Sequence, residues 1–104
     1  METVNEKSVC VITTVFTDED KNLVTPTAAT YRIDDLATGA AIVALTSITP
    51  VTGTYDIIIA ASSNAIIDTT RSYETKVVTV NWTFGTGTAN AEYRYRVKNL
   101  FKVT

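Results

Sequence analysis

Apolar and polar residues alternate along much of this chain, most regularly in its last third, residues 73–103. Within 74–84 the apolar side chains fall on every second position, at Val78, Val80, Trp82 and Phe84. A period of two residues is typical of a strand that buries one face. Polar residues fill the other positions or the ends of this segment: Lys76, Thr79, Asn81 and Thr83. The pattern predicts the first strand of a long β-hairpin.

The chain is expected to reverse direction at residues 85–90, which contain two glycines and an asparagine. These residue types tolerate the positive φ angles that reversing loops need. Beyond the loop Tyr93, Tyr95 and Val97 alternate with three basic residues, which predicts a returning strand with one apolar face. Folding the hairpin about 85–90 pairs Trp82 with Tyr93, Val80 with Tyr95, Val78 with Val97, Asn81 with Arg94, Thr79 with Arg96 and Val77 with Lys98.

Shorter segments with the same period predict strands at about 8–16, 27–34, 41–46 and 54–60, and a short edge piece at 23–24. Residues 47–53 should form a connection, 60–65 can form a single helical turn, and Ile66 and Ile67 should plug one end of the fold. The first six residues are polar and should be frayed. Short strands separated by turns every ~8 to 12 residues predict an antiparallel β-sandwich with about seven strands. At 104 residues the whole chain, 1–104, is expected to form a single domain.

The first predicted strand is apolar on both faces. Val9, Val11 and Val15 share one face, and Cys10, Ile12 and Phe16 share the other. A small sandwich buries only one face of a strand in its core, so the second face must be covered by another segment, by a neighbouring molecule, or by a switch of the strand between sheets. The pattern does not decide which of the two faces is the outer one, and Val9, Val11 and Val15 are taken as the candidates for a protein interface.

Composition narrows the function classes. The chain is 45% hydrophobic and 19% charged, which is ordinary for a globular protein, and its twenty threonines favour strands. A net charge of −2 predicts no general attraction to nucleic acid or to anionic membranes. No apolar run approaches the ~18 residues of a spanning helix, and the N-terminus lacks the features of a secretory signal. If Met1 is the native start, the protein should be made in the cytosol and stay there.

Few residues here could carry out chemistry. The chain has no histidine and one cysteine, which excludes His-based catalysis and the usual zinc ligand sets. Asp18, Asp20 and Asn22 imitate the start of a calcium loop, but Leu23 and Ala29 stand where that loop requires glycine and glutamate. The glycines at 85 and 87 lack the lysine and helix of a phosphate-binding loop. We therefore expect no enzymatic activity, no cofactor and no metal.

Arg94, Arg96 and Lys98 form the one basic stripe of the sequence. A nucleic-acid reader would need exposed aromatic side chains among these charges, whereas the neighbouring tyrosines alternate onto the opposite face. The stripe is therefore expected to be a solvated sheet face or a second part of a protein interface, and not a nucleic-acid site.

Several stretches resemble the strands of small immunoglobulin-like β-sandwich proteins encoded among the head and tail genes of tailed bacteriophages. They are residues 73–80, the Gly-Thr-Gly loop at 85–87, residues 92–100, residues 28–35 with Thr38 and Gly39, and residues 52–57. The resemblance covers about residues 8–102. It implies a non-enzymatic virion protein, made in the host cytoplasm, that decorates the capsid or serves as a head–tail or tail accessory subunit. Its partners would be copies of itself or capsid, portal or tail proteins.

A second hypothesis is a recognition module that binds carbohydrate or a cell surface. Isolated immunoglobulin-like domains often have this role, and a fold alone does not decide between the two functions.

Overall fold

The structure, a computed structural model of the chain, describes residues 2–50, 52–85 and 87–100. Within these residues the fold is all-β, as the sequence predicted, and a single short 3-10 helix is the only helical element. The elements are β1 (Glu2–Asn5), β2 (Cys10–Val15), β3 (Ala28–Asp35), β4 (Ala41–Ile48), β5 (Thr54–Ile59), the 3-10 helix η1 (Ala61–Asn64), β6 (Tyr73–Phe84) and β7 (Gly87–Lys98).

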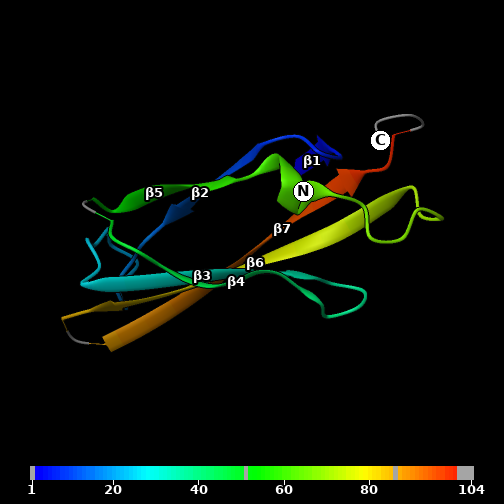
Figure 1. The fold of residues 1–104 in the computed structure, drawn as a ribbon. Helices are drawn as coiled ribbons and strands as arrows, with labels where there is room; N and C mark the ends of the chain where they lie inside the picture. Colours follow the sequence, from blue (N-terminus) through cyan, green and yellow to red (C-terminus); the bar gives the residue numbers. More distant parts are fainter. Residues whose placement is uncertain (1, 51, 86, 101–104) are drawn as a thin grey trace.

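The strands form two sheets. A five-stranded sheet has the order β1-β7-β6-β3-β4, and β2 pairs with β5 in a two-stranded antiparallel sheet. Figure 1 shows the smaller sheet lying over one face of the larger one. The larger sheet is mixed because β1 runs parallel to β7, so the prediction of a wholly antiparallel fold was wrong.

Both sheets contribute side chains to one core. Alternate residues of β2, β3, β5, β6 and β7 point inward, as the period of two requires. The buried residues of this core are Cys10, Ile12 and Phe16 from the β2 segment, Ala29 and Ile33 from β3, Ile57 and Ile59 from β5, Val78, Val80 and Trp82 from β6, and Tyr95 and Val97 from β7. Trp82 packs edge-on against Phe16, with ring centroids 5.3 Å apart.

The N-terminal segment is a strand and not a frayed tail. Residues 2–5 pair with 95–98 at the edge of β7, where Val4 packs against the core. Glu6 is buried just beyond this strand, and its Oε1 accepts a hydrogen bond from the Leu100 backbone N–H at 2.7 Å. The edge of β7 offers unpaired N–H and C=O groups, and residues 2–5 form a strand by pairing with them. The polar sequence of this segment does not by itself indicate such a partner.

The β6–β7 hairpin exists, but its predicted register was wrong. Phe84 pairs with Gly87, so the strands nearly meet at a two-residue connection and Trp82 lies opposite Ala89. Val78, and not Trp82, pairs with Tyr93. The Tyr93 hydroxyl instead lies 3.1 Å from Thr14 Oγ1, across the core on β2. Because the shift is an even number of residues, every side chain keeps the face that alternation assigned to it.

The remaining element boundaries differ by a few residues. β4 continues to Ile48, into the predicted connection, while Leu23 forms one isolated bridge to Thr17 instead of a strand. The predicted helical turn is present as η1. Ile66 packs against the core as expected, but Ile67 is exposed.

Candidate interaction surfaces

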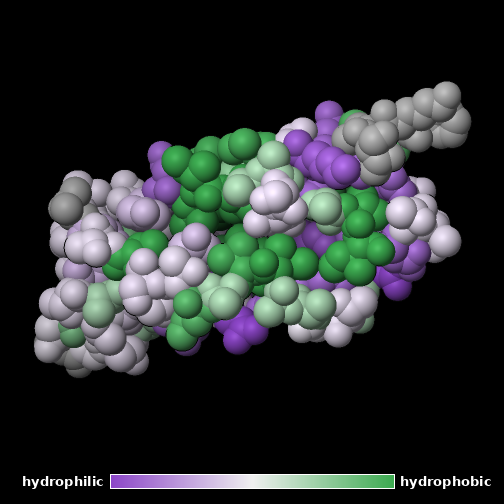
Figure 2. Space-filling view, viewed as in Figure 1, coloured by the Kyte–Doolittle hydropathy of each residue, from purple (hydrophilic) through white to green (hydrophobic). Residues whose placement is uncertain are grey.

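The outer face of the two-stranded sheet is apolar. Val11 lies opposite Ile58 in the β2–β5 register, and these side chains are 46% and 69% exposed. Val9 and Val15 are exposed on the same side of the β2 segment, whereas Cys10, Ile12, Thr14 and Phe16 point into the core. Figure 2 shows hydrophobic side chains gathered over this sheet. We call Val9, Val11, Val15 and Ile58 the apolar face.

Two of the three coverings considered from the sequence, another segment of the chain and a switch of the strand between sheets, are not seen in the described residues. Within the described residues no other segment lies over the apolar face, and β2 stays paired with β5 along its whole length. Ile58 belongs to the same surface, although the sequence interpretation did not include it. Its position in the alternation of β5, opposite in parity to Ile57 and Ile59, was the signal that could have found it.

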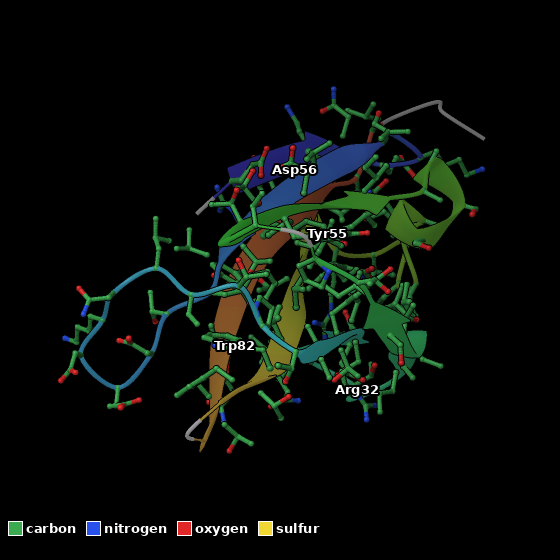
Figure 3. The ribbon with its side chains drawn as sticks, turned by 90° about the vertical axis from the view of Figure 1, so that its left-hand side faces the viewer. Arg32, Tyr55, Asp56 and Trp82 are labelled. Atoms are coloured by element: carbon green, nitrogen blue, oxygen red, sulfur yellow. The ribbon has the colours of Figure 1, made fainter. Side chains whose placement is uncertain are left out.

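One charged side chain interrupts the apolar face. Asp56 lies opposite Thr13 in the register, and the Thr13 hydroxyl donates to Asp56 Oδ1 at 2.7 Å. Figure 3 shows Asp56 on the outer side of β5, with Tyr55 on the side of the larger sheet. A partner that covers this surface must therefore leave the Asp56 carboxylate near water or supply it with a hydrogen-bond donor.

The basic stripe lies on the opposite side of the molecule. Arg94, Arg96 and Lys98 project from the outer face of β7, away from the core that Tyr95 and Val97 enter. Arg94 forms an ion pair with Glu92 at 2.7 Å, and the Arg96 guanidinium lies 4.6 Å from the centre of the Tyr73 ring. The structure thus separates the two halves of the predicted interface, because the valines and the basic residues belong to opposite outer faces.

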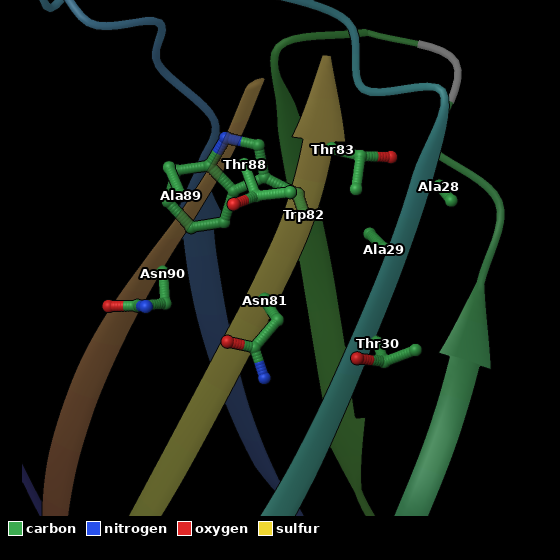
Figure 4. A pocket seen from close by; sticks show the side chains of 9 residues that line it. All are labelled: Ala28, Ala29, Thr30, Asn81, Trp82, Thr83, Thr88, Ala89 and Asn90. Atoms are coloured by element: carbon green, nitrogen blue, oxygen red, sulfur yellow. The ribbon is translucent and has the colours of Figure 1, made fainter.

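A shallow groove of about 310 Å³ crosses the outer face of the larger sheet near the hairpin end (Figure 4). Three neighbouring strands line it with neutral residues: Ala28, Ala29, Thr30, Asn81, Trp82, Thr83, Thr88, Ala89 and Asn90. None of these described residues is ionisable, so this part of the groove fits neutral polar groups better than ions.

A buried ion cluster occupies the other end of the larger sheet. Lys76 Nζ donates to Asp35 Oδ1 at 3.0 Å and to Glu74 Oε1 at 2.9 Å, and all three residues are buried. The sequence interpretation counted Lys76 among the polar positions of the strand. Its parity is that of Val78 and Val80, so strict alternation places both Glu74 and Lys76 on the core side.

Hydrogen bonds set the charge state of these carboxyl groups. Burial raises the pKa of Asp35, but hydrogen bonds from Lys76 and Thr38 outweigh burial and hold that pKa below its usual value. Burial likewise raises the pKa of Glu74, and bonds from the Ile67 N–H, from Lys76 and from the Asp68 N–H reverse the shift. Both groups are therefore carboxylates at neutral pH.

A second buried network fixes η1 to the core. The Tyr95 hydroxyl donates to Asn64 Oδ1 at 2.7 Å, and Asn64 Nδ2 donates to the Ser8 carbonyl at 2.8 Å. Burial raises the pKa of Tyr95, so its hydroxyl stays protonated as a donor. Every polar atom in this chain of contacts has a partner, which is the arrangement of a structural network.

The Asp18 segment forms a turn. Asp18 Oδ1 accepts hydrogen bonds from the backbone N–H groups of Asp20 and Asn22. Residues 2–50, 52–85 and 87–100 contain no group of three or more acidic or cysteine side chains arranged to hold a metal ion. In the same residues no helix has the length and apolar character needed to cross a membrane.

Comparisons with known proteins found no matching family model, no matching curated protein and no matching solved structure. The function proposed below therefore depends on the residues of this chain, on their geometry and on the resemblance of strand sequences described above.

Proposed function

We propose that this protein is a non-enzymatic structural subunit of a bacteriophage virion that acts through protein–protein contacts of its apolar face. The observation that carries the proposal is the exposure of Val9, Val11, Val15 and Ile58 on one side of a two-stranded sheet. Clustered aliphatic side chains of this kind mark interaction sites, because leaving them in water forgoes the free energy of burial.

The fold that goes with this role is an immunoglobulin-like β-sandwich. Strand order supports it: β7, β6, β3 and β4 are neighbours in the order of immunoglobulin strands G, F, C and C′, and β2 pairs with β5 as strand B pairs with strand E. Side chains of both sheets meet in one core. Cys10 is the single cysteine of the chain and is a free, buried thiol, so the disulfide of antibody domains is absent.

The virion assignment comes from the resemblance of the strand sequences to phage head and tail proteins of this fold. Within that class the role is capsid decoration or a head–tail or tail accessory subunit, and the protein is located in the virion after synthesis in the host cytoplasm. The proposal includes neither nucleic acid nor membrane as a partner, because the net charge is −2 and Tyr95, the aromatic residue between Arg94 and Arg96, is buried in the core.

The occupant of the apolar face is another copy of the chain. Closed symmetric contacts between copies are the commonest way in which soluble proteins cover such a surface. Asp56 lies between Val11 and Val15 on this face, so the second copy must leave its carboxylate near water or supply it with a donor, in addition to the hydroxyl of Thr13. A capsid, portal or tail protein on the same face is the other outcome of the test.

A recognition module that binds carbohydrate is the second candidate function. The groove over β3, β6 and β7 supports it, since neutral amide and hydroxyl groups at Thr30, Asn81 and Asn90 can bond to sugar hydroxyls. Among the described residues that line the groove, Trp82 is the one aromatic residue, and its inward parity places its ring in the core and not where a sugar could stack. For this reason the structural role is preferred.

Two neighbouring substitutions test the proposal. Val11→Asp places a charge on the apolar face and should leave the chain folded but monomeric. Ile12→Asp places the same charge in the core, where Ile12 is 7% exposed, and should unfold the domain. Circular dichroism measures folding and size-exclusion chromatography measures assembly. A folded Val11→Asp variant that assembles like the wild type would refute the proposed interface.

A further inference from the structure

The cluster of Lys76, Asp35 and Glu74 places an amine beside a carboxyl group in the protein interior. We propose that Lys76 and Asp35 become joined by an intramolecular isopeptide bond, with Glu74 as the group that transfers protons. This inference goes beyond the proposed function and does not depend on it.

The nucleophile and the electrophile are held together by the sheet. Lys76 lies directly opposite Asp35 in the β3–β6 register, so their side chains leave neighbouring backbone positions on the same face. Lys76 Nζ is already 3.0 Å from Asp35 Oδ1. Positioning of this kind removes most of the entropic cost of bringing two reactants together.

Thr38 prepares the Asp35 carboxyl group for attack. Its backbone N–H and its hydroxyl both donate to Asp35 Oδ2, at 3.0 and 2.8 Å. A tight turn holds Thr38 there: the Gly39 N–H donates to the Asp35 carbonyl, and Gly39 adopts a φ of 73°. Two donors on Oδ2 stabilise the negative charge that develops on this oxygen when an amine adds to the carbon. Oδ1, which faces Lys76, is then the oxygen that leaves.

Glu74 completes the proton transfers. The Lys76 ammonium first gives one proton to Asp35 Oδ1 across their 3.0 Å contact, and the neutral amine attacks Cγ. A second proton passes from Nζ to Glu74 Oε1, 2.9 Å away, and from there to Oδ1. The Nζ–Cγ bond forms, the Cγ–Oδ1 bond breaks, one water molecule leaves, and Glu74 returns to its carboxylate form.

Burial favours the product. The cluster holds one positive and two negative groups out of water, and each such charge is penalised by desolvation. Amide formation removes one charge of each sign. Glu74 keeps its charge, with the backbone N–H groups of Ile67 and Asp68 at 2.9 and 2.7 Å as donors. The bond would also link residues 41 positions apart in the sequence, which restricts the unfolded chain as a disulfide does.

Intact-mass spectrometry of the purified, folded chain under denaturing conditions tests this inference. The expected mass is lower than the sequence mass by one water molecule. Trypsin should then fail to cleave after Lys76 and should yield peptide 33–71 joined to peptide 72–94. A folded wild-type chain that keeps its full sequence mass after prolonged incubation at neutral pH would overturn the proposal.

Substitutions in the cluster distinguish the role of Glu74 from that of Lys76. Glu74→Gln keeps the size of the side chain but loses the proton acceptor, and Lys76→Arg loses the nucleophile, so both should have their full sequence masses. Asp34→Asn is the matched control, because Asp34 precedes Asp35 but pairs with Arg32 on the outer face, and this variant should keep the mass deficit. A mass deficit in Glu74→Gln would overturn the role of Glu74. The wild-type mass decides the existence of the bond even if a variant fails to fold.

Discussion

Trp82 illustrates what could be predicted for single residues. Alternation alone placed this side chain in the core, and the structure confirms that it is buried. Its contacts could not be predicted, since the edge-on packing against Phe16 and the hydrogen bond from its indole N–H to the Thr17 carbonyl involve residues more than sixty positions away. Lys76 shows the converse case: its parity with Val78 and Val80 was available in the sequence, but the residue was counted among the polar positions of the strand.

Replacing Trp82 by alanine should lower the free energy of unfolding by ~3 to 5 kcal/mol, because it leaves a cavity and removes a buried hydrogen bond. Equilibrium denaturation measures this loss. Asn81→Ala is the control on the adjacent, exposed position and should change stability by no more than about 0.5 kcal/mol. A loss below ~1 kcal/mol for Trp82→Ala would mean that the indole does not pack in the core.

Cys10 should be an inert thiol. Burial, together with the nearby Glu2 carboxylate, raises the pKa of Cys10 from 9.0 to about 11, so the reactive thiolate is scarce at neutral pH. Because this pKa is higher in the folded state than in the unfolded state, the free energy of unfolding should fall as the pH rises from 9.0 towards 11. The Cys10→Ala variant should lose less of its free energy of unfolding over the same range.

Alkylation of Cys10 at neutral pH should be slow in the native protein and fast after unfolding. Equal rates would contradict the burial of this residue.

Elements were predicted more reliably than their pairing. Hydrophobic period predicts which face of a strand is buried, and this prediction was correct for β5, β6 and β7. For β2 it could not choose, because both faces of that strand are apolar. Register depends on the length of the connection, and the glycine-containing segment 85–90 allows a wide loop or a tight one. β1 was missed for a related reason: a short polar strand is stabilised by the edge that it joins, and nothing in its own sequence indicates that edge.

Engineered disulfides distinguish the two registers of the β6–β7 hairpin. In a Cys10→Ala background, Asn81→Cys with Asn90→Cys should form a cross-strand disulfide, because these residues are direct partners. Asn81→Cys with Arg94→Cys tests the register inferred from the sequence. In the structure Arg94 is four residues further along β7, roughly 13 Å away, and should not reach. Mass spectrometry under non-reducing conditions detects a disulfide in either variant. A disulfide in the Asn81 and Arg94 pair alone would contradict the register of the structure.

At the scale of the whole molecule, the sequence suggested two sets of interface residues, the valines of the first strand and the basic residues of the last. The structure places these two sets on opposite outer faces. The apolar face could be predicted because β2 is hydrophobic at both parities. Its separation from Arg94, Arg96 and Lys98 could not, since it depends on how the two sheets stack. The ion cluster also needed the fold, because Asp35 and Lys76 become neighbours only when β3 pairs with β6.

Sedimentation velocity over a range of protein concentrations is the most direct test of the central claim, that the apolar face joins copies of this chain. The wild type should assemble, and Ile58→Asp should be a folded monomer. Leu45→Asp is the matched control, because Leu45 is an aliphatic residue of similar exposure, 62% against 69%, on β4 of the other sheet, and this variant should assemble normally. A wild type that stays monomeric at every concentration, or an Ile58→Asp variant that assembles as the wild type does, would contradict the account.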